Sequence, residues 1–206
     1  SKNIGFLAMK EKYPNDYKNI TFVFNDIDIM PVKKNFLNYI TKQNIVKHFY
    51  GFKFALGGIV SITGNDFEKI NGYSNNWGWG FEDNLLNDKC LHYKITIDRS
   101  VFYNRGSKEF IELRYSSNRI INNNEPGYYL SKIYDDLKNI KNLKYNITDN
   151  NIYSNIFKKN NEYIINITQF DTLIKHPNND DLYIKDTYGK TTVKVDALNK
   201  NKVKFR

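Results

Sequence analysis

The pattern of hydrophobic and polar positions predicts helices and strands from the start of the chain. Apolar residues recur at helical spacing over residues 4–13, so a helix is predicted there, and Pro14 ends it. The continuous apolar run Ile20–Phe24 predicts a strand buried on both faces. Asp26 and Asp28 follow this strand directly. Both carboxylates are therefore expected at the C-terminal edge of a sheet, where open α/β sheets bind ligands.

The middle of the chain continues this alternation. The second apolar run, Phe54–Ile62, is interrupted by Gly57 and Gly58, and the short helix after it is expected to be capped at Thr63 or Asn65. Later segments are predicted as a helix over 82–91, a strand over 94–97, a polar stretch suited to a lid or a flexible loop over 104–127, a helix over 129–143 and paired strands over 145–157 and 163–170. The order of the elements indicates an α/β fold.

Composition and charge exclude several classes of protein. With 40% hydrophobic and 16% aromatic residues, the 206-residue chain is not disordered, and it holds no apolar run of membrane-spanning length. The net charge of +9 comes from lysines spread along a sequence rich in residues with A/T-rich codons, so no nucleic-acid partner is predicted. Cys90 alone cannot build a disulfide framework, and three scattered histidines make zinc hydrolase chemistry improbable.

The first group of candidate functional residues is the pair Asp26 and Asp28. Alternate residues of an extended segment point to the same side, so both carboxylates can converge on one hard cation such as Mn²⁺ or Mg²⁺. Such a cation can neutralise a diphosphate leaving group. A solvated turn after a strand explains the same spacing, because isolated D-x-D pairs are common. The apolar strand before the pair strengthens the metal interpretation, and both interpretations stay open.

The second group is the loop and helix start Trp77–Asp83. Two tryptophans separated by glycines make a poor core, whereas flat aromatic faces suit stacking on sugars. Glu82 and Asp83 then begin a helix, where the macrodipole favours ionised carboxylates, and an ionised Asp beside a bound hydroxyl can act as a general base. An ordinary loop with acidic residues at a helix start explains the pattern equally well. Gly57 and Gly58 indicate a bulge or a close approach of ligand to backbone.

Taken together, these segments resemble the β-1,4-galactosyltransferase family, including its xylosylprotein galactosyltransferase branch. The segments that carry the resemblance are Phe22–Asp28, Gly57–Ser61 and Asn71–Asp83, the last of which reads N-G-x-S-N-x-W-G-W-G-x-E-D and is highly specific. The resemblance implies a GT-A-like, Rossmann-related nucleotide-sugar transferase fold. Residues 1–170 would be the C-terminal half of the catalytic region, and 171–206 a β-rich C-terminal extension.

The function that the resemblance implies is a metal-dependent, inverting transfer of galactose from UDP-galactose to a sugar hydroxyl of a glycan or glycoconjugate, with a β-1,4 linkage. By this carry-over, Asp26 and Asp28 hold the metal and the diphosphate, with Asp28 the direct ligand. Trp79 closes over donor and acceptor, Glu82 holds the donor sugar, and Asp83 deprotonates the acceptor hydroxyl. Gly57 and Gly58 would line the donor and acceptor sites.

Several positions depart from the family pattern. Tyr115 stands where a metal-binding His is expected, and Glu112, three residues earlier, stands where another ligand can sit, so the Mn²⁺ or Mg²⁺ site is either rebuilt or weak. Asn84 replaces an Asp that helps to bind the acceptor, and Phe81 replaces a Gly or Leu. Ala55 replaces a Tyr that restricts the donor to galactose, which makes UDP-GalNAc a second candidate donor.

Two expectations concern the rest of the protein. The family's N-terminal nucleotide-binding strands precede the start of this sequence, so we expect other domains of a longer polypeptide or a fold completed in another way. A non-catalytic sugar- or nucleotide-binding module on the same scaffold is the alternative function; Tyr115 and the missing strands favour it, and the intact acidic pairs favour an enzyme. The A/T-biased composition and unpaired Cys90 favour the cytoplasm, such as the host cytoplasm of a large DNA virus, over the Golgi lumen.

Overall fold

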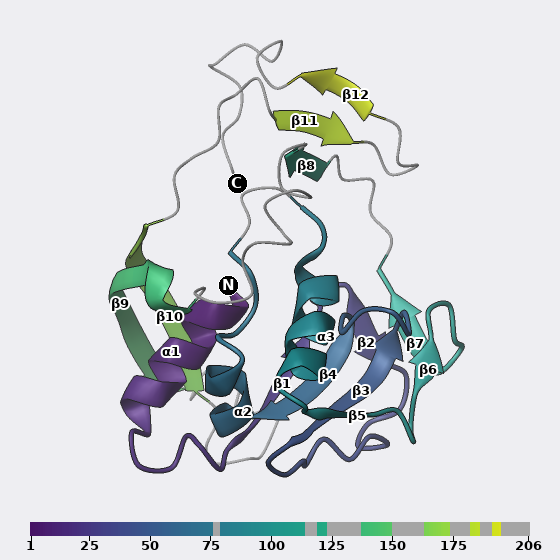
Figure 1. Ribbon diagram of the computed structural model, residues 1–206, viewed down its shortest axis with the longest axis horizontal. Helices are drawn as coiled ribbons and strands as arrows, with labels where there is room; N and C mark the ends of the chain where they lie inside the picture. Colours follow the sequence, from purple (N-terminus) through teal and green to yellow (C-terminus); the bar gives the residue numbers. More distant parts are fainter. Residues whose placement is uncertain are drawn as a thin grey trace.

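A mixed five-stranded sheet is formed by strands from the first half of the chain (Figure 1). The computed structural model describes residues 1–75, 79–113, 119–122, 137–149, 163–173, 182–185 and 191–194. The strand order is β1 (Thr21–Asn25), β4 (Ile59–Thr63), β3 (Ile45–Gly51) and β5 (Thr96–Asp98), with β6 (Tyr103–Asn104) paired to the end of β3. β4 is antiparallel to β1 and β3, whereas β5 and β6 are parallel to β3. This is the α/β class that the sequence predicted.

The strand that is buried on both faces is β4. All five of its residues are buried, because it lies between β1 and β3 and is covered from both sides. The expectation that Ile20–Phe24 is buried on both faces is wrong. Residues 21–24 belong to β1, which pairs only with β4 among the described strands, and Val23 on β1 is 42% exposed. An apolar run does not distinguish a central strand from an edge strand.

Two hydrophobic clusters pack on the sheet. The larger cluster joins it to α1 (Lys2–Lys12), α2 (Gly64–Lys69) and α3 (Glu82–His92), and the smaller one joins it to the segments around β2 (Ile29–Pro31) and β7 (Phe110–Glu112). Consecutive residues of β4 illustrate the division, since Ile59 belongs to the smaller cluster and Val60 to the larger one. The alternation of side chains along a strand requires this arrangement.

The predicted helices at 4–13 and 82–91 are confirmed as α1 and α3, and the strand at 94–97 is confirmed as β5. Thr63 is the N-cap of α2, because its side-chain oxygen accepts a hydrogen bond of 3.2 Å from the Asp66 amide. The sequence did not predict β3, the strand that pairs with most neighbours. Its alternation is broken by Lys47 and by His48, which is buried.

Most of the described residues in the last part of the chain belong to strands. The prediction of a helix over 129–143 is wrong at its end, because Leu137–Asn139 form a 3₁₀ turn and β9 (Ile140–Asp149) begins directly after it. β9 pairs antiparallel with β10 (Tyr163–Thr172) from Ile140↔Thr172 onwards, so tertiary pairing overrides the amphipathic pattern. The paired strands predicted over 145–157 and 163–170 are confirmed over residues 145–149 and 163–170, and residues 150–157 lie outside the described residues.

A separate three-stranded sheet contains β8 (Arg119–Asn122), β11 (Leu182–Lys185) and β12 (Thr191–Lys194), drawn at the top of Figure 1. The pairing of β8 with β11 crosses the domain boundary predicted at residue 170, and that boundary stays a prediction. Within the described ranges, none of the helices has the length and apolar character needed to span a membrane.

Candidate active site

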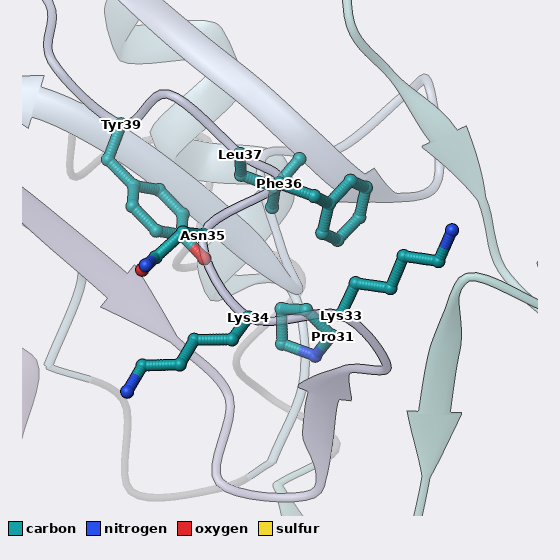
Figure 2. Close-up of a pocket in the computed structure, with 7 residues that line it drawn as sticks. All are labelled: Pro31, Lys33, Lys34, Asn35, Phe36, Leu37 and Tyr39. Atoms are coloured by element: carbon teal, nitrogen blue, oxygen red, sulfur yellow. The ribbon is translucent and has the colours of Figure 1, made fainter.

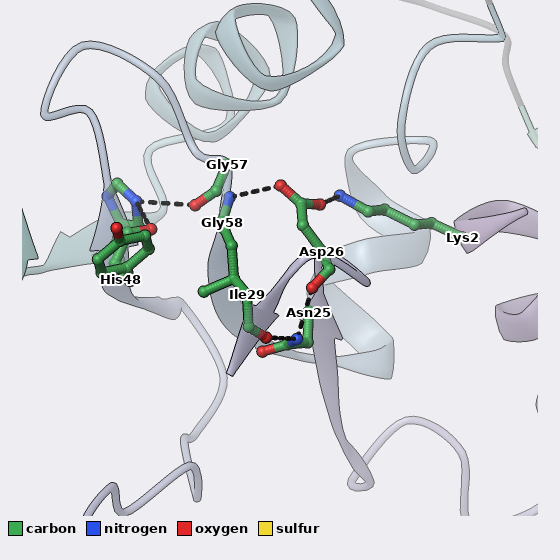
Figure 3. A network of polar contacts seen from close by, with 8 residues as sticks. Lys2, Asn25, Asp26, Ile29, His48, Gly57 and Gly58 are labelled. Atoms are coloured by element: carbon green, nitrogen blue, oxygen red, sulfur yellow. Dashed lines mark hydrogen bonds and ion pairs between the residues drawn. The ribbon is translucent and has the colours of Figure 1, made fainter. Parts of the chain in front are cut away.

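The end of β1 meets the start of β4 in a pair of reciprocal hydrogen bonds, and Figure 3 shows the one that the Asp26 carboxylate accepts. The Asp26 amide donates to the Gly58 carbonyl at 2.9 Å, and the Gly58 amide donates to Asp26 Oδ2 at 3.1 Å. The other carboxylate oxygen of Asp26 accepts a hydrogen bond of 2.8 Å from the Lys2 ammonium group. Asp26 therefore ties α1 to β4, and the predicted site residues Asp26, Gly57 and Gly58 do come together.

The Asp83 carboxylate lies directly against Gly57. A Cβ atom at position 57 would lie 2.1 Å from Asp83 Oδ2, so no other residue fits there without displacing the carboxylate. Asp83 is the second residue of α3, and its own carbonyl accepts a 2.9 Å hydrogen bond from the Leu56 amide. The close approach that the glycine pair predicted is thus made by this carboxylate. Asp83 Oδ1 is buried and has no hydrogen-bond partner.

The surroundings of Asp83 move its protonation into the physiological range. Burial raises the pKa of Asp83 to about 7, the Lys2 charge acts to lower it, and the nearby Glu82 and Asp26 charges add to the rise. A carboxyl with a pKa near neutral pH is well matched to accept a proton in general base catalysis. An unpartnered buried oxygen and a raised pKa together distinguish Asp83 from an ordinary acidic residue at a helix start.

Lys2 is a member of this site that the sequence did not reveal. Its ammonium group lies 4.6 Å from the centre of the Tyr73 ring and bonds Asp26. Burial acts to lower the pKa of Lys2, but Tyr73, Asp26 and Asp83 raise it above the ordinary value, so the residue stays charged. In the sequence Lys2 is one of several lysines on α1, and only the fold places it beside two carboxylates.

The loop before α3 places Glu82 and two aromatic side chains. Glu82 accepts a 3.0 Å hydrogen bond from the Gly80 amide, and Asn84 follows as a half-buried residue on the first turn. Phe81 adopts a left-handed conformation with φ of 66°, which is unusual for a residue with a side chain. Trp79 is 48% exposed. Trp77 and Gly78 of the same predicted motif lie outside the described residues.

Asp28 lies in the turn directly before β2, and Glu112 lies on β7, the strand that pairs with β2. Ile29 pairs with Glu112 across β2 and β7, and the Leu113 amide donates to the Asp28 carbonyl at 2.7 Å. The Glu112 carboxylate accepts hydrogen bonds from the Tyr50 hydroxyl and from the Gly106 amide at 3.0 Å, and it pairs with Arg105 at 3.4 Å. Burial acts to raise the pKa of Glu112, but these donors lower it below its usual range.

The predicted metal ligands differ in how free their oxygen atoms are. The Asp28 carboxylate makes no hydrogen bond or ion pair with the described residues, so it is open to a hard cation, and carboxylate oxygens suit Mn²⁺ or Mg²⁺. Asp26 and Glu112 already hold partners on both oxygens. Tyr115 lies outside the described residues, and among those that are described no three His, Cys, Asp or Glu side chains gather as a metal site. The complete ligand set stays a prediction.

The segment before the glycine pair contrasts a buried and an exposed side chain. Ala55, predicted to face the donor sugar, is buried at 6% exposure, whereas Phe54 is 66% exposed and stacks on Phe52 at 5.2 Å between ring centres. At Gly58, φ is +72° and a Cβ atom would lie 2.3 Å from the Tyr50 carbonyl oxygen, so this position also requires glycine.

A cavity of about 320 Å³ lies on the segment that follows β2 (Figure 2). The residues that line it are Pro31, Lys33, Lys34, Asn35, Phe36, Leu37 and Tyr39. None of them belongs to the predicted site, and the cavity is therefore distinct from the cluster around Asp83.

The segment that contains the glycine pair and the buried Asp83 carboxylate is similar in sequence to a known protein family. Residues 43–111 match a family model described as the N-terminal domain of galactosyltransferase. This range includes the predicted residues Ala55, Gly57, Gly58, Trp79 and Glu82 to Asn84, whereas Asp26, Asp28, Glu112 and Tyr115 lie outside it. The match confirms the resemblance to galactosyltransferases that the sequence motifs predicted.

Individual relatives of the chain come from more than one branch of the galactosyltransferases. Mouse β-1,4-galactosyltransferase 4 is 34% identical over 109 residues, which cover 47% of this chain and 30% of the relative. Xylosylprotein 4-β-galactosyltransferase of Caenorhabditis elegans is 30% identical over 86 residues, or 37% of this chain and 30% of the relative. The aligned part of the chain thus spans about a third of the length of these curated relatives.

Among solved structures, the catalytic domain of Drosophila β-1,4-galactosyltransferase 7 in complex with xylobiose matches with a TM-score of 0.45 and 18% sequence identity. The match covers 71% of this chain and 64% of that chain. A mutant of the same enzyme, in complex with manganese, UDP-Gal and xylobiose, matches with the same TM-score and 17% identity.

Proposed function

We propose that this chain is part of a metal-dependent, inverting glycosyltransferase of the β-1,4-galactosyltransferase type, with a GT-A-like fold. It would transfer galactose from UDP-galactose to a sugar hydroxyl of a glycan or glycoconjugate, with a β-1,4 linkage. The observation that carries the proposal is the Asp83 carboxylate, which lies against Gly57 with one buried, unpartnered oxygen. The sequence match over residues 43–111 and the manganese and UDP-Gal complex of a relative support the same class.

In this mechanism Asp83 accepts the proton of the acceptor hydroxyl. The hydroxyl oxygen attacks the anomeric carbon of the donor sugar, and UDP leaves from the opposite face with the electron pair of the broken bond. A base with a pKa near neutral pH is suited to this step because it is partly ionised at working pH and still basic enough to take the proton. A bound Mn²⁺ ion would supply charge to the leaving diphosphate.

The residues around Asp83 would hold the substrates. Asp28 offers an open carboxylate to the metal ion. Lys2 and Gly58 hold the Asp26 carboxylate in place, so Asp26 would form a fixed wall of the donor site. Glu82 and the exposed Trp79 ring would contact the sugars, because carboxylates accept hydrogen bonds from sugar hydroxyls and aromatic faces stack on sugar rings.

The decisive experiment compares Asp83→Asn with the matched variant Asp88→Asn, which changes an exposed acid on the same helix. Release of UDP from UDP-galactose would be measured with Mn²⁺ and a panel of sugar acceptors. We expect Asp83→Asn to lose at least about 1,000-fold in kcat with little change in donor affinity, since it keeps the shape but not the base. Full activity in Asp83→Asn would rule the assigned base out.

The metal assignment has its own test. Calorimetric titration of UDP with Mn²⁺ present should show binding to the wild-type chain that Asp28→Ala loses. Glu112→Ala is the informative comparison, because the Glu112 carboxylate already accepts hydrogen bonds from Tyr50 and Gly106. Reduced Mn²⁺ affinity in Glu112→Ala would add it to the ligands, and unchanged affinity would assign it to holding β7 alone.

The donor sugar is the finer part of the proposal. Ala55 leaves space where the family has a Tyr, so we propose that UDP-GalNAc is used at least comparably to UDP-galactose and that Ala55→Tyr restores galactose preference by about 10- to 200-fold. The competing residue is Phe54, whose exposed ring can take the place of that Tyr. A competition assay in which Phe54→Ala, and not Ala55→Tyr, changes the donor ratio would assign the role to Phe54.

The alternative function is a sugar- or nucleotide-binding module without turnover. Tyr115, which stands where the family has a metal-binding His, supports it. It is distinguished by the first experiment: a binding module would bind UDP-sugar by calorimetry and release no UDP in the wild type, with Asp83→Asn unchanged in both readouts.

Cellular location remains a proposal as well. The composition and the buried, unpaired Cys90 support the cytoplasm. Fractionation of cells that express the full-length protein would test this, and recovery in the Golgi lumen would contradict it.

A further inference from the structure

His48 is a buried polar residue that the proposed chemistry does not use. It lies on β3 with 0% exposure, and its Nε2 atom is 3.1 Å from the Tyr50 carbonyl oxygen and 3.1 Å from the Gly57 carbonyl oxygen (Figure 3). Its Nδ1 atom is 3.1 Å from Arg99 Nε. Both nitrogen atoms of the ring therefore have defined partners.

These partners determine where the ring carries its proton. An Arg side chain only donates hydrogen bonds, so Nδ1 of His48 must accept from Arg99 and carries no proton. The proton lies on Nε2, which donates to the two carbonyl oxygens. Burial and the Arg99 charge lower the pKa of His48 to about 4, although the two carbonyl groups act in the opposite direction. The ring is neutral at physiological pH.

The hydrogen bonds form a closed path that returns to the helix of Asp83. Arg99 also donates to Asn87 Oδ1 at 3.4 Å, and Asn87 lies one turn after Asp83 on α3. At the other end of that turn, the Asp83 carbonyl accepts from the Leu56 amide at 2.9 Å. The first turn of α3 therefore has two connections to residues 56–57. One is the direct hydrogen bond at Asp83, and the other runs from Asn87 through Arg99 and His48.

We propose that His48 is a positioning residue for Asp83: its Nε2–H group fixes the Gly57 peptide, and the Gly57 peptide forms the surface against which the Asp83 carboxylate lies. The inference rests on the proposed function only for its effect on turnover. The geometric part stands on its own, because it concerns the place of one peptide between an imidazole and a carboxylate.

The physical reason is the small space at this point. A Cβ atom at position 57 would overlap the Asp83 carboxylate, and one at Gly51, where φ is +139°, would lie 2.9 Å from the Gly57 oxygen. The Gly57 peptide is therefore enclosed between β3 and α3, but a glycine pair by itself has little conformational stiffness. The hydrogen bond from His48 supplies the restraint that the two glycines lack.

The test uses the full chain and three variants. His48→Gln keeps an N–H donor near the position of Nε2, His48→Phe keeps the ring volume without a donor, and His92→Gln changes an exposed histidine at the end of α3 as the matched control. Nitrogen-15 NMR of the histidine rings gives the tautomer and protonation of His48. Carbon-13 NMR of labelled aspartate gives the protonation of Asp83, and steady-state assays with UDP-galactose and Mn²⁺ give kcat and KM.

We expect the wild type to show the Nε2–H tautomer with no protonation of His48 above about pH 5. The charged and titratable groups around Asp83, namely Lys2, Asp26, Glu82 and Tyr73, are the same in every variant. A change in the pKa of Asp83 therefore reports the Gly57 peptide. In His48→Phe we expect water to enter, the pKa of Asp83 to fall by about 1 toward its ordinary value, and kcat to drop about 10- to 100-fold with KM nearly unchanged.

His48→Gln should restore most of both quantities, and His92→Gln should leave them at the wild-type values. If His48→Phe does not fold, Arg99→Gln replaces it in the test. This variant keeps the imidazole but not its fixed tautomer, so the pKa of Asp83 and kcat should change in the same direction by a smaller amount. An Nδ1–H tautomer in the wild type, or an unchanged pKa of Asp83 in folded His48→Phe, would overturn the proposal. If the wild type releases no UDP, the two NMR readouts still decide the positioning role, and only the proposed function fails.

Discussion

Single residues in this site are held by partners that come from distant parts of the chain. Asp26 is fixed by Lys2, 24 positions earlier, and by Gly58, 32 positions later. The pKa of Asp83 is raised because burial removes water from its carboxylate. The same burial that raises the pKa of a catalytic base also makes its charged form costly to bury. Such a residue can therefore favour activity while it lowers the stability of the fold.

A prediction at this scale concerns the stability of Asp83→Asn as a function of pH. The pKa of Asp83 is about 7 in the folded chain and 3.8 ordinarily, so the folded state binds the proton more tightly. The free energy of unfolding of the wild type therefore falls as pH rises from about 4 to about 7, and the deficit is complete above that range. Asn carries no charge at any pH, so Asp83→Asn should be more stable than the wild type at pH 8 and equal to it at pH 3.5.

The size of this gain is limited by solvent. The full pKa difference corresponds to about 4 kcal/mol, and because Asp83 is only partly shielded we expect about 1–3 kcal/mol. Urea denaturation at several pH values measures it, with Asp88→Asn, an exposed acid on the same helix, as the matched control. A gain in Asp83→Asn that is the same at pH 3.5 and pH 8 would contradict the assigned pKa.

At the scale of elements, the site depends on how β4 begins. β4 enters the sheet between β1 and β3 through Gly58, whose backbone is left-handed and whose missing side chain lets the Tyr50 carbonyl approach. The N-cap of the helix that carries Asp83 is Phe81, which is also in a left-handed conformation. The site is therefore built where two elements start from unusual backbone conformations, as is often found at functional sites.

Replacing Gly58 by Ala tests this junction. The added Cβ atom would lie 2.3 Å from the Tyr50 carbonyl oxygen, so β4 must move away from β3. Gly106 is the matched control, because its φ of +83° is equally left-handed but no atom lies within 4 Å of an added Cβ. We expect Gly106→Ala to lose about 1 kcal/mol of stability from backbone strain, and Gly58→Ala to lose about 3 kcal/mol or more. Equal losses in urea denaturation would show that the contact with β3 is unimportant.

At the scale of the whole molecule, α1, β1, β4 and α3 meet at one point although they span the first 92 residues of the chain. A ligand that contacts several of these elements stabilises all of them together, because it binds the folded state and not the unfolded one. Thermal unfolding therefore reports binding without an assay for turnover.

We expect UDP-galactose and Mn²⁺ together to raise Tm by about 5–10 °C at 100 times their dissociation constant, and Mn²⁺ alone to raise it much less. Asp28→Asn should lose the combined effect, because its amide is a weaker ligand for a hard cation. Asp16→Asn, on an exposed turn after α1, should keep it. A full shift in Asp28→Asn would mean that the nucleotide binds without the metal site proposed here.

The sequence by itself determined the local elements and the chemistry of the motif. Helical spacing and Pro14 predicted α1 to within two residues at each end, and Thr63 was one of two predicted caps of α2. The specific stretch that ends at Asp83 carried both the family resemblance and the candidate base. These features depend on neighbouring residues, which a linear pattern records directly.

Only the tertiary structure decided which strand is central, which residues surround Asp83 and where residues 140–143 belong. β1 became an edge strand and 140–143 became part of β9, because strand pairing is set by distant segments rather than by local pattern. Lys2 and His48 entered the site for the same reason. Their side chains resemble other lysines and histidines in the sequence, and their roles come from burial and from partners brought close by folding.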